Sequence, residues 1–296
     1  MEQKNLLMAI VLSVAIMLGW QFYIEQTAPP PTDKKAEQLQ APVAPKKSSD
    51  ATLAPPAPGT AGSGQNTGLP NQIQEQAKRR AAQAVPRVQI FSPRVTGSLS
   101  LVGARFDDLT FEDYREAIEP DSEKVTLLKP FGTDNSYYAY YGWVSADTDV
   151  PPLDAKWTAD REKLTPNKPV TLSWTNKDGV VFQQIISLDE HYMFTVQQRV
   201  TNRSSKIANV FPFGQIARRG TPDVLDFYIL HEGLLGVFNG VLKEVDYDDL
   251  QDSNSKVIAN ERSTGGWIGI TDKYWLAALI PDQKSSVDTR FSDSVQ

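Results

Sequence analysis

The chain has 296 residues, with 30 Lys and Arg against 36 Asp and Glu, two His and no Cys. Within these residues the lack of Cys excludes disulfides, thiolate metal sites and a cysteine nucleophile. The net charge of −6 argues against a protein that coats nucleic acid, so we expect no nucleic-acid partner.

The first block, residues 1–26, contains an apolar run of 19 uncharged residues, Leu6–Ile24. In a helix this run spans about 28 Å, close to the thickness of a bilayer's hydrocarbon core. Trp20 and Tyr23 gather at one end, where amphipathic rings favour the membrane–water interface. We interpret 1–26 as a transmembrane anchor helix. The alternative is a cleaved signal peptide with a mature N-terminus near Ala28.

The second block, residues 27–86, has ten Pro and no aromatic residue. Such a segment buries too little apolar surface to offset its ordering entropy, which predicts a disordered Pro/Ala-rich linker. Lys78-Arg79-Arg80 is interpreted as a solvated charge run, with contact to acidic lipid as the alternative. The free amino terminus and Lys4 favour a cytoplasmic N-terminus, which places residues from about 27 onward in the periplasm of a Gram-negative cell.

The third block, residues 87–296, alternates apolar and polar residues with a period of two. For example, Tyr192, Phe194, Val196 and Val200 share one predicted strand face. Two further strands flank a four-residue turn, Asn176–Gly179. The predicted strands lie at 95–101, 170–175, 180–188, 192–200, 208–213, 225–230, 266–271 and 274–280. These predict an all-β fold, one large antiparallel β-sandwich.

Catalytic chemistry is sought in the two histidines. His191, His231 and Glu232 could act as acid and base on a sugar, as in aldose-epimerase-like enzymes. However, His231 and Glu232 are neighbours, so on a strand their side chains would point to opposite faces. We therefore assign no catalytic, cofactor-binding or metal-binding residue and expect no enzyme activity and no cofactor.

Two compositional clusters have structural interpretations. The acidic run Glu244–Asp252 lacks the spacing of a calcium loop and is expected to be a solvated loop. The aromatic run Tyr137–Trp143 is expected to be a packed strand, with a peptide- or sugar-stacking surface as the alternative. Trp267 and Trp275 are predicted to be largely buried.

Several stretches together resemble the bacterial membrane protein insertase family YidC. They include the apolar helix that opens with Asn5-Leu6-Leu7 and ends in Gly19-Trp20, followed by the Pro/Ala-rich linker. In the β-rich block they are GSLSLVGARFDDL at 97–109, YAYYGW at 138–143, LHEG at 230–233 and GGWIGITDKYW at 265–275. The last is the most specific of them.

The resemblance implies an N-terminal anchor followed by a periplasmic supersandwich similar to galactose-mutarotase-like domains. It also implies insertion, folding and assembly of integral membrane proteins in the inner membrane, alone or with the Sec translocon. The implied partners are the bilayer, nascent membrane proteins, and the translocon with its accessory subunits. In that family a groove in later membrane helices performs insertion. The 296 residues resemble an N-terminal fragment that contains the anchor and most of the periplasmic domain but not the groove. The alternative is a membrane-anchored carbohydrate-binding or epimerase-like β-sandwich.

Overall fold

The computed structural model describes residues 84–293, apart from 120, 223–229 and 253–256. The predicted anchor at 1–26 and the predicted linker up to residue 83 lie outside these ranges. No helix within them is long and apolar enough to cross a membrane. The description below therefore concerns the β-rich block.

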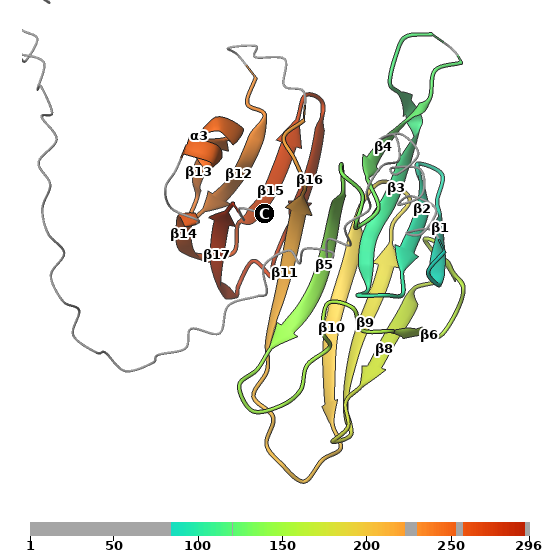
Figure 1. Ribbon diagram of the computed structural model, residues 1–296, viewed down its shortest axis with the longest axis vertical. Helices are drawn as coiled ribbons and strands as arrows, with labels where there is room; N and C mark the ends of the chain where they lie inside the picture. The colour runs from blue at the N-terminus through green and yellow to red at the C-terminus, as the bar shows by residue number, and fades with distance from the viewer. Residues whose placement is uncertain (1–83, 120, 223–229, 253–256, 294–296) are drawn as a thin grey trace, which may run out of the picture. The chain divides into compact units, whose positions relative to one another are not determined.

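The regular secondary structure of the described ranges is almost wholly strand, with one short helix (Figure 1). The strands are β1 (Arg87–Phe91), β2 (Val95–Ser100), β3 (Arg105–Arg115), β4 (Lys124–Leu128), β5 (Tyr137–Val144), β6 (Thr158–Ala159), β7 (Lys163–Leu164), β8 (Val170–Thr175), β9 (Val180–Leu188), β10 (Phe194–Asn202), β11 (Phe211–Arg218), β12 (Gly233–Phe238), β13 (Val241–Asp246), β14 (Val257–Thr264), β15 (Trp267–Asp272), β16 (Trp275–Leu279) and β17 (Ser286–Ser292). The helix is α3 (Tyr247–Asp252).

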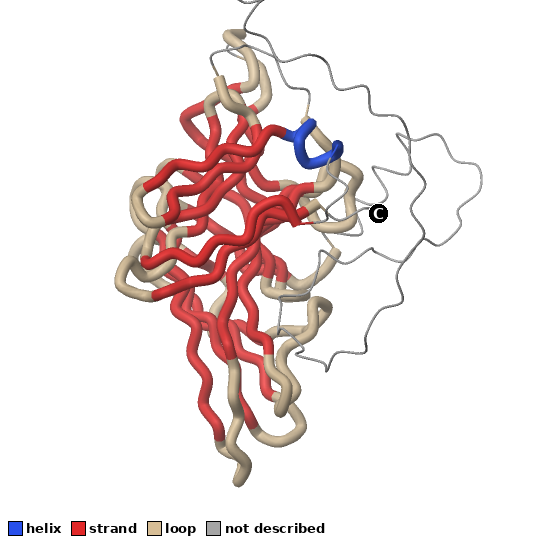
Figure 2. The backbone as a smooth tube through the Cα atoms, turned by 90° about the vertical axis from the view of Figure 1, so that its left-hand side faces the viewer, coloured by secondary structure: helices blue, strands red, loops and turns tan. Residues whose placement is uncertain are grey.

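The described strands form four sheets. The largest has the order β11-β5-β3-β2-β1-β7, with β4 paired to β3. A second has the order β10-β9-β8-β6, a third β13-β12-β15-β16, and β14 pairs with β17. Figure 2 shows these strands as stacked layers with loops gathered at their ends. All pairs among these strands are antiparallel except β1 with the two-residue β7, which is parallel.

The first two sheets pack face to face as the predicted sandwich. Side chains from β1, β2 and β3 meet those of β8 and β9 in one continuous apolar core. Trp143 of the first sheet contacts Phe182 of the second with ring centroids 5.2 Å apart. Gln184, itself fully buried, donates through Nε2 to the carbonyl of Tyr141 at 2.8 Å. The core thus includes a cross-sheet hydrogen bond as well as apolar contacts.

The predicted turn at Asn176–Gly179 is confirmed between β8 and β9. The Oδ1 of Asn176 accepts hydrogen bonds from the backbone N–H groups of Asp178 and Val180, at 3.0 and 2.9 Å. Gly179 has φ +84°, a conformation that favours glycine. The turn residues therefore act as the pattern predicts.

The aromatic run Tyr137–Trp143 forms β5 and is a packed strand. Tyr137, Tyr138, Tyr140 and Trp143 are all buried. Both faces of the strand are covered because the second sheet lies against one face and the 145–157 connection against the other. Tyr140, Tyr141 and Trp143 also line the cavity described below, so the stacking-surface alternative stays a prediction.

Several sequence-based boundaries are corrected by the structure. The acidic run Glu244–Asp252 is not a solvated loop: it ends β13 and forms α3, and Val245, Tyr247 and Leu250 are buried. The strand expected at 208–213 begins at Phe211 and continues to Arg218, because pairing with β5 carries it further. Most of the strand expected at 225–230 lies outside the described residues. Strands β12 and β13 match none of the predicted strands.

The burial predicted for two tryptophans is also corrected. Trp267 and Trp275 are only partly buried: Trp267 begins β15, whose residues are partly or fully buried, and Trp275 begins β16, whose alternate residues are exposed. Trp275 packs on the rim of the core, 4.9 Å from the rings of both Phe111 and Tyr114.

Candidate functional site

The two histidines lie in separate connections, one between β9 and β10 and the other just before β12. His191 is exposed in the turn between β9 and β10, where its backbone N–H donates to Asp189. His231 lies just before β12, in the third sheet. An acid–base pair that acts on one sugar needs both groups within hydrogen-bond reach of the same ligand. This placement does not support the epimerase-like alternative.

His231 and Glu232 both have structural partners. The Nδ1 of His231 lies 2.9 Å from an oxygen of Asp246, and its Nε2 lies 3.0 Å from the carbonyl of Leu234. Glu232 accepts the backbone N–H of Lys273 at 2.9 Å. These contacts hold β12 to β13 and to the β15–β16 turn, which explains the short motif that spans 230–233.

A cavity of about 460 Å³ lies beside the C-terminal half of β5. It is lined by Gly103, Tyr140, Tyr141, Gly142, Trp143, Val144, Ser145, Val150, Pro151, Pro152, Leu153, Trp157 and Phe213. No carboxylate, imidazole or amine is among them, so the lining offers no acid–base pair. Burial raises the pKa of Tyr141 to about 12, so its phenol stays neutral. The cavity suits apolar contact and not proton transfer.

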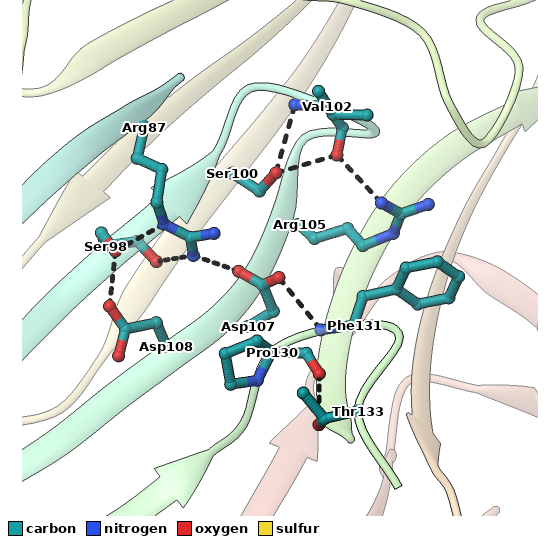
Figure 3. A network of polar contacts seen from close by, with 10 residues as sticks. All are labelled: Arg87, Ser98, Ser100, Val102, Arg105, Asp107, Asp108, Pro130, Phe131 and Thr133. Carbon is teal, nitrogen blue, oxygen red and sulfur yellow. Dashed lines mark hydrogen bonds and ion pairs between the residues drawn. The ribbon is translucent and has the colours of Figure 1, made fainter. Parts of the chain in front are cut away.

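A buried arginine fixes the wall of this cavity (Figure 3). Arg105 donates to the carbonyls of Val102 and Leu153, and so connects β3 to the 145–157 connection. Its guanidinium stacks 3.9 Å from the ring centre of Phe131. On another side the backbone of Gly103 approaches so closely that a Cβ there would lie 2.8 Å from the guanidinium carbon. Burial lowers the pKa of Arg105 from its ordinary value.

A second buried pair lies next to it. Arg87, at the start of β1, forms an ion pair with Asp107 of β3, and both side chains are almost fully buried. Asp107 also accepts the backbone N–H of Phe131 at 3.2 Å. Burial raises the pKa of Asp107, although Arg87 opposes that shift. Figure 3 shows Arg87 also reaching Ser98 on β2, so this charge pair ties three strands together.

The first and third sheets are joined by another charged cluster. Arg218 of β11 contacts both carboxylate oxygens of Asp272 on β15, at 2.6 and 2.7 Å. Its guanidinium lies 4.9 Å from the ring centre of Tyr137. The hydroxyl of Tyr247 from α3 lies 3.4 Å from Asp272, and burial raises the pKa of that phenol to about 12. Sequence reasoning missed this cluster because Arg218 and Asp272 are 54 residues apart and match no local motif.

The charged side chains in these three clusters bind one another or the backbone, which is a structural use. Within the described residues, no group of three or more His, Asp or Glu is placed to hold a metal ion.

Comparison with known proteins gives one consistent result. Residues 87–296 match the family model of the YidC periplasmic domain. Curated relatives named membrane protein insertase YidC include that of Granulibacter bethesdensis, 40% identical over 99% of this chain and 49% of the relative. Those of Methylobacterium radiotolerans and Rickettsia bellii are 38% and 39% identical, each over 99% of this chain and 49% of the relative. The chain spans about half the length of the curated relatives it matches.

Proposed function

Because this chain belongs to the YidC family, we propose that the protein inserts, folds and assembles integral membrane proteins in the bacterial inner membrane. The observation that carries this proposal is likeness along 99% of the chain to relatives named as insertases, and not to the β-domain alone. The likeness therefore includes the apolar run and the Pro/Ala-rich segment, which a separate sugar-binding β-sandwich would not need.

The proposed organisation has three parts. Residues 1–26 anchor the chain in the inner membrane with the N-terminus in the cytoplasm. Residues 27–86 form a linker, and residues 87–296 form the periplasmic domain. The apolar run Leu6–Ile24 and the change of composition near residue 87 support this division.

Insertion needs no bond chemistry, so we propose that the protein is not an enzyme and uses no cofactor. A polar group in hydrocarbon costs several kcal/mol unless it is hydrogen-bonded, and a wet groove lowers that cost. Transfer of the apolar segment into lipid then supplies the driving free energy. The curated relatives are about twice as long as this chain, so we propose that insertion itself belongs to segments other than residues 1–296.

The proposed partners are the lipid bilayer, nascent integral membrane proteins, and the Sec translocon with its accessory subunits. For the periplasmic domain we propose a docking and structural role. No nucleic-acid partner is proposed, because residues 87–296 carry 22 basic against 30 acidic side chains, a net charge of 22 − 30 = −8.

Depletion in the source bacterium tests the proposal. When the full-length gene is switched off, short integral membrane proteins should fail to insert. The uninserted form should remain accessible to protease. Re-expression of the full-length gene should restore their insertion, whereas residues 1–296 alone should not. Unchanged insertion after depletion would contradict the insertase proposal. Rescue by residues 1–296 would instead contradict the assignment of insertion to other segments.

A further inference from the structure

The connection between β10 and β11 projects from one end of the sandwich and carries exposed cationic and apolar side chains. Arg203 and Lys206 are exposed cations. Ile207, which follows Lys206 in the chain, is 83% exposed. Phe211, the first residue of β11, is 54% exposed. We call Arg203, Lys206 and Ile207 the basic tip. Large apolar side chains this exposed next to cations are typical of surfaces that meet a lipid headgroup layer.

The basic tip is held in shape by its own hydrogen bonds. Asn202 accepts from the backbone N–H and the hydroxyl of Ser204, at 2.9 and 2.7 Å. Its Nδ2 donates to the carbonyl of Lys206 at 2.7 Å. At the other end of the connection, Asn209 donates to Asp147 through its backbone N–H and its Nδ2, at 3.1 and 2.6 Å. The connection is therefore preorganised, which lowers the entropy lost on binding.

The acidic groups at this end leave the two cations of the tip without an ion pair among the described residues. Asp147 accepts the hydrogen bonds of Asn209 just described, and Asp149 pairs with Lys177 at 2.9 Å. Asp178 lies in the β8–β9 turn beside Lys177. With Lys177, this end carries three cations against the three carboxylates Asp147, Asp149 and Asp178, a net charge of 3 − 3 = 0, whereas the β-rich block as a whole has a net charge of −8.

The opposite end of the sandwich is acidic. The β3–β4 connection carries Glu116, Glu119, Asp121 and Glu123. Phe111 near the end of β3 contacts Tyr192 just before β10, with ring centroids 5.5 Å apart. The acidic connection therefore lies near the start of β10 and the basic tip follows its end, nine residues or about 30 Å away. Figure 1 shows the two connections projecting in opposite directions.

The direction in which the chain enters the domain agrees with this polarity. Strand β1 begins at Arg87, paired with Ser100, and ends at Phe91, paired with Thr96 near the acidic end. The chain thus enters β1 from the side that faces the basic tip. A linker of about 60 residues has a typical end-to-end distance of about 40 Å, so the proposed anchor leaves this end within reach of the membrane.

From these observations we propose that the basic tip binds the anionic phospholipid surface of the membrane that anchors the chain. Arg203 and Lys206 contact headgroup phosphates, and Ile207 enters the interface beside them. The acidic β3–β4 connection is repelled by the same surface, so the sandwich stands with the basic tip toward the bilayer. The inference rests on the membrane location proposed above.

The test uses residues 1–296, which contain no Cys and so accept a single reporter. Ser205→Cys, within the tip, and Ala117→Cys, in the acidic connection, each receive an environment-sensitive fluorophore. Both labelled chains are reconstituted in vesicles of phosphatidylcholine alone or with 30% phosphatidylglycerol, chosen as roughly a physiological anionic fraction. We expect a blue shift of the tip fluorophore in the anionic vesicles only, reversed by high salt, and no shift of the fluorophore in the acidic connection. Equal emission of the tip fluorophore in both vesicles would overturn the inference.

Substitutions distinguish binding by the cations of the basic tip from a general effect of the chain's net charge. Arg203→Gln with Lys206→Gln should weaken tip binding about 25-fold, since each cation contributes about fivefold near an anionic surface. Lys168→Gln with Lys284→Gln removes the same charge from exposed positions elsewhere and should leave the shift unchanged. An equal loss in both double variants would contradict a specific tip. Flotation with the vesicles tests the anchor separately, because an anchored chain floats with either lipid composition whether or not the tip binds.

Discussion

Arg218 and Asp272 lie on different sheets, and their side chains meet at 2.6 and 2.7 Å. Together with Tyr137 and Tyr247, this ion pair connects the end of β11 to the end of β15. The link lies at the junction of the sandwich with the third sheet. It therefore gives a direct way to ask how strongly the two parts are coupled.

Breaking this pair should destabilise the domain. Arg218→Met and Asp272→Asn each leave a partly buried charge without its partner, and we expect each to lower the free energy of unfolding by about 2 kcal/mol. Because the two effects share one interaction, the double variant should lose less than the sum. Urea unfolding monitored by tryptophan fluorescence measures all three.

The exposed pair Arg262–Asp288 is the matched control, at 2.7 Å between β14 and β17. Its side chains are 74% and 66% exposed, so water screens the attraction. Arg262→Met should shift the unfolding midpoint too little to distinguish from the unaltered chain. An equal effect at both pairs would show that burial is not what gives the Arg218 pair its strength.

The tryptophans should differ in their contribution to stability. Trp143 is buried against Trp157 and Phe182, so Trp143→Ala should cost about 3–5 kcal/mol. Trp275 is only partly buried, and Trp275→Ala should cost less, about 2 kcal/mol. Thermal and denaturant unfolding of the two variants would check this order. A larger loss for Trp275→Ala would mean that its contacts with Phe111 and Tyr114 outweigh full burial.

Two glycines separate backbone strain from steric conflict. Gly240 and Gly266 have φ +83° and +84°, so alanine is strained at both. A Cβ at Gly240 meets nothing within 4 Å, whereas at Gly266 it would lie 2.0 Å from the carbonyl oxygen of Val237. Gly240→Ala should therefore cost about 1 kcal/mol and Gly266→Ala roughly 3 kcal/mol or more. Similar unfolding free energies for the two variants would contradict the close packing of β15 on β12.

Acid should remove a contribution made by Asp147. Hydrogen bonds from the side chain and backbone of Asn209 and from Ser145 lower the pKa of this carboxyl in the folded chain. Its stabilisation is then complete above the unfolded pKa of about 3.9 and is lost as the pH falls through the folded value. The stability difference between the unaltered chain and Asp147→Asn should shrink as the pH falls from 6 to about 2. A difference that stays constant over that range would mean that the carboxylate's charge is not involved.

The sequence by itself predicted the local features of this fold. Alternation of apolar and polar residues indicated β8, β9 and β10, because successive side chains of a strand that covers a core point alternately into the core and away from it. The turn at Asn176–Gly179 could be predicted because its hydrogen bonds form between residues that are close together in the chain. The resemblance to YidC also rested on short stretches whose residues are neighbours in the chain.

Only the tertiary structure decided which distant residues meet. The acidic run Glu244–Asp252 reads as polar, yet Tyr247 and Leu250 are drawn into the core when α3 packs. The pairs Arg87–Asp107 and Arg218–Asp272, and the separation of the basic tip from the acidic connection, depend on strand order and register. No local pattern encodes these relationships, because each is set by which strands pair across long stretches of chain.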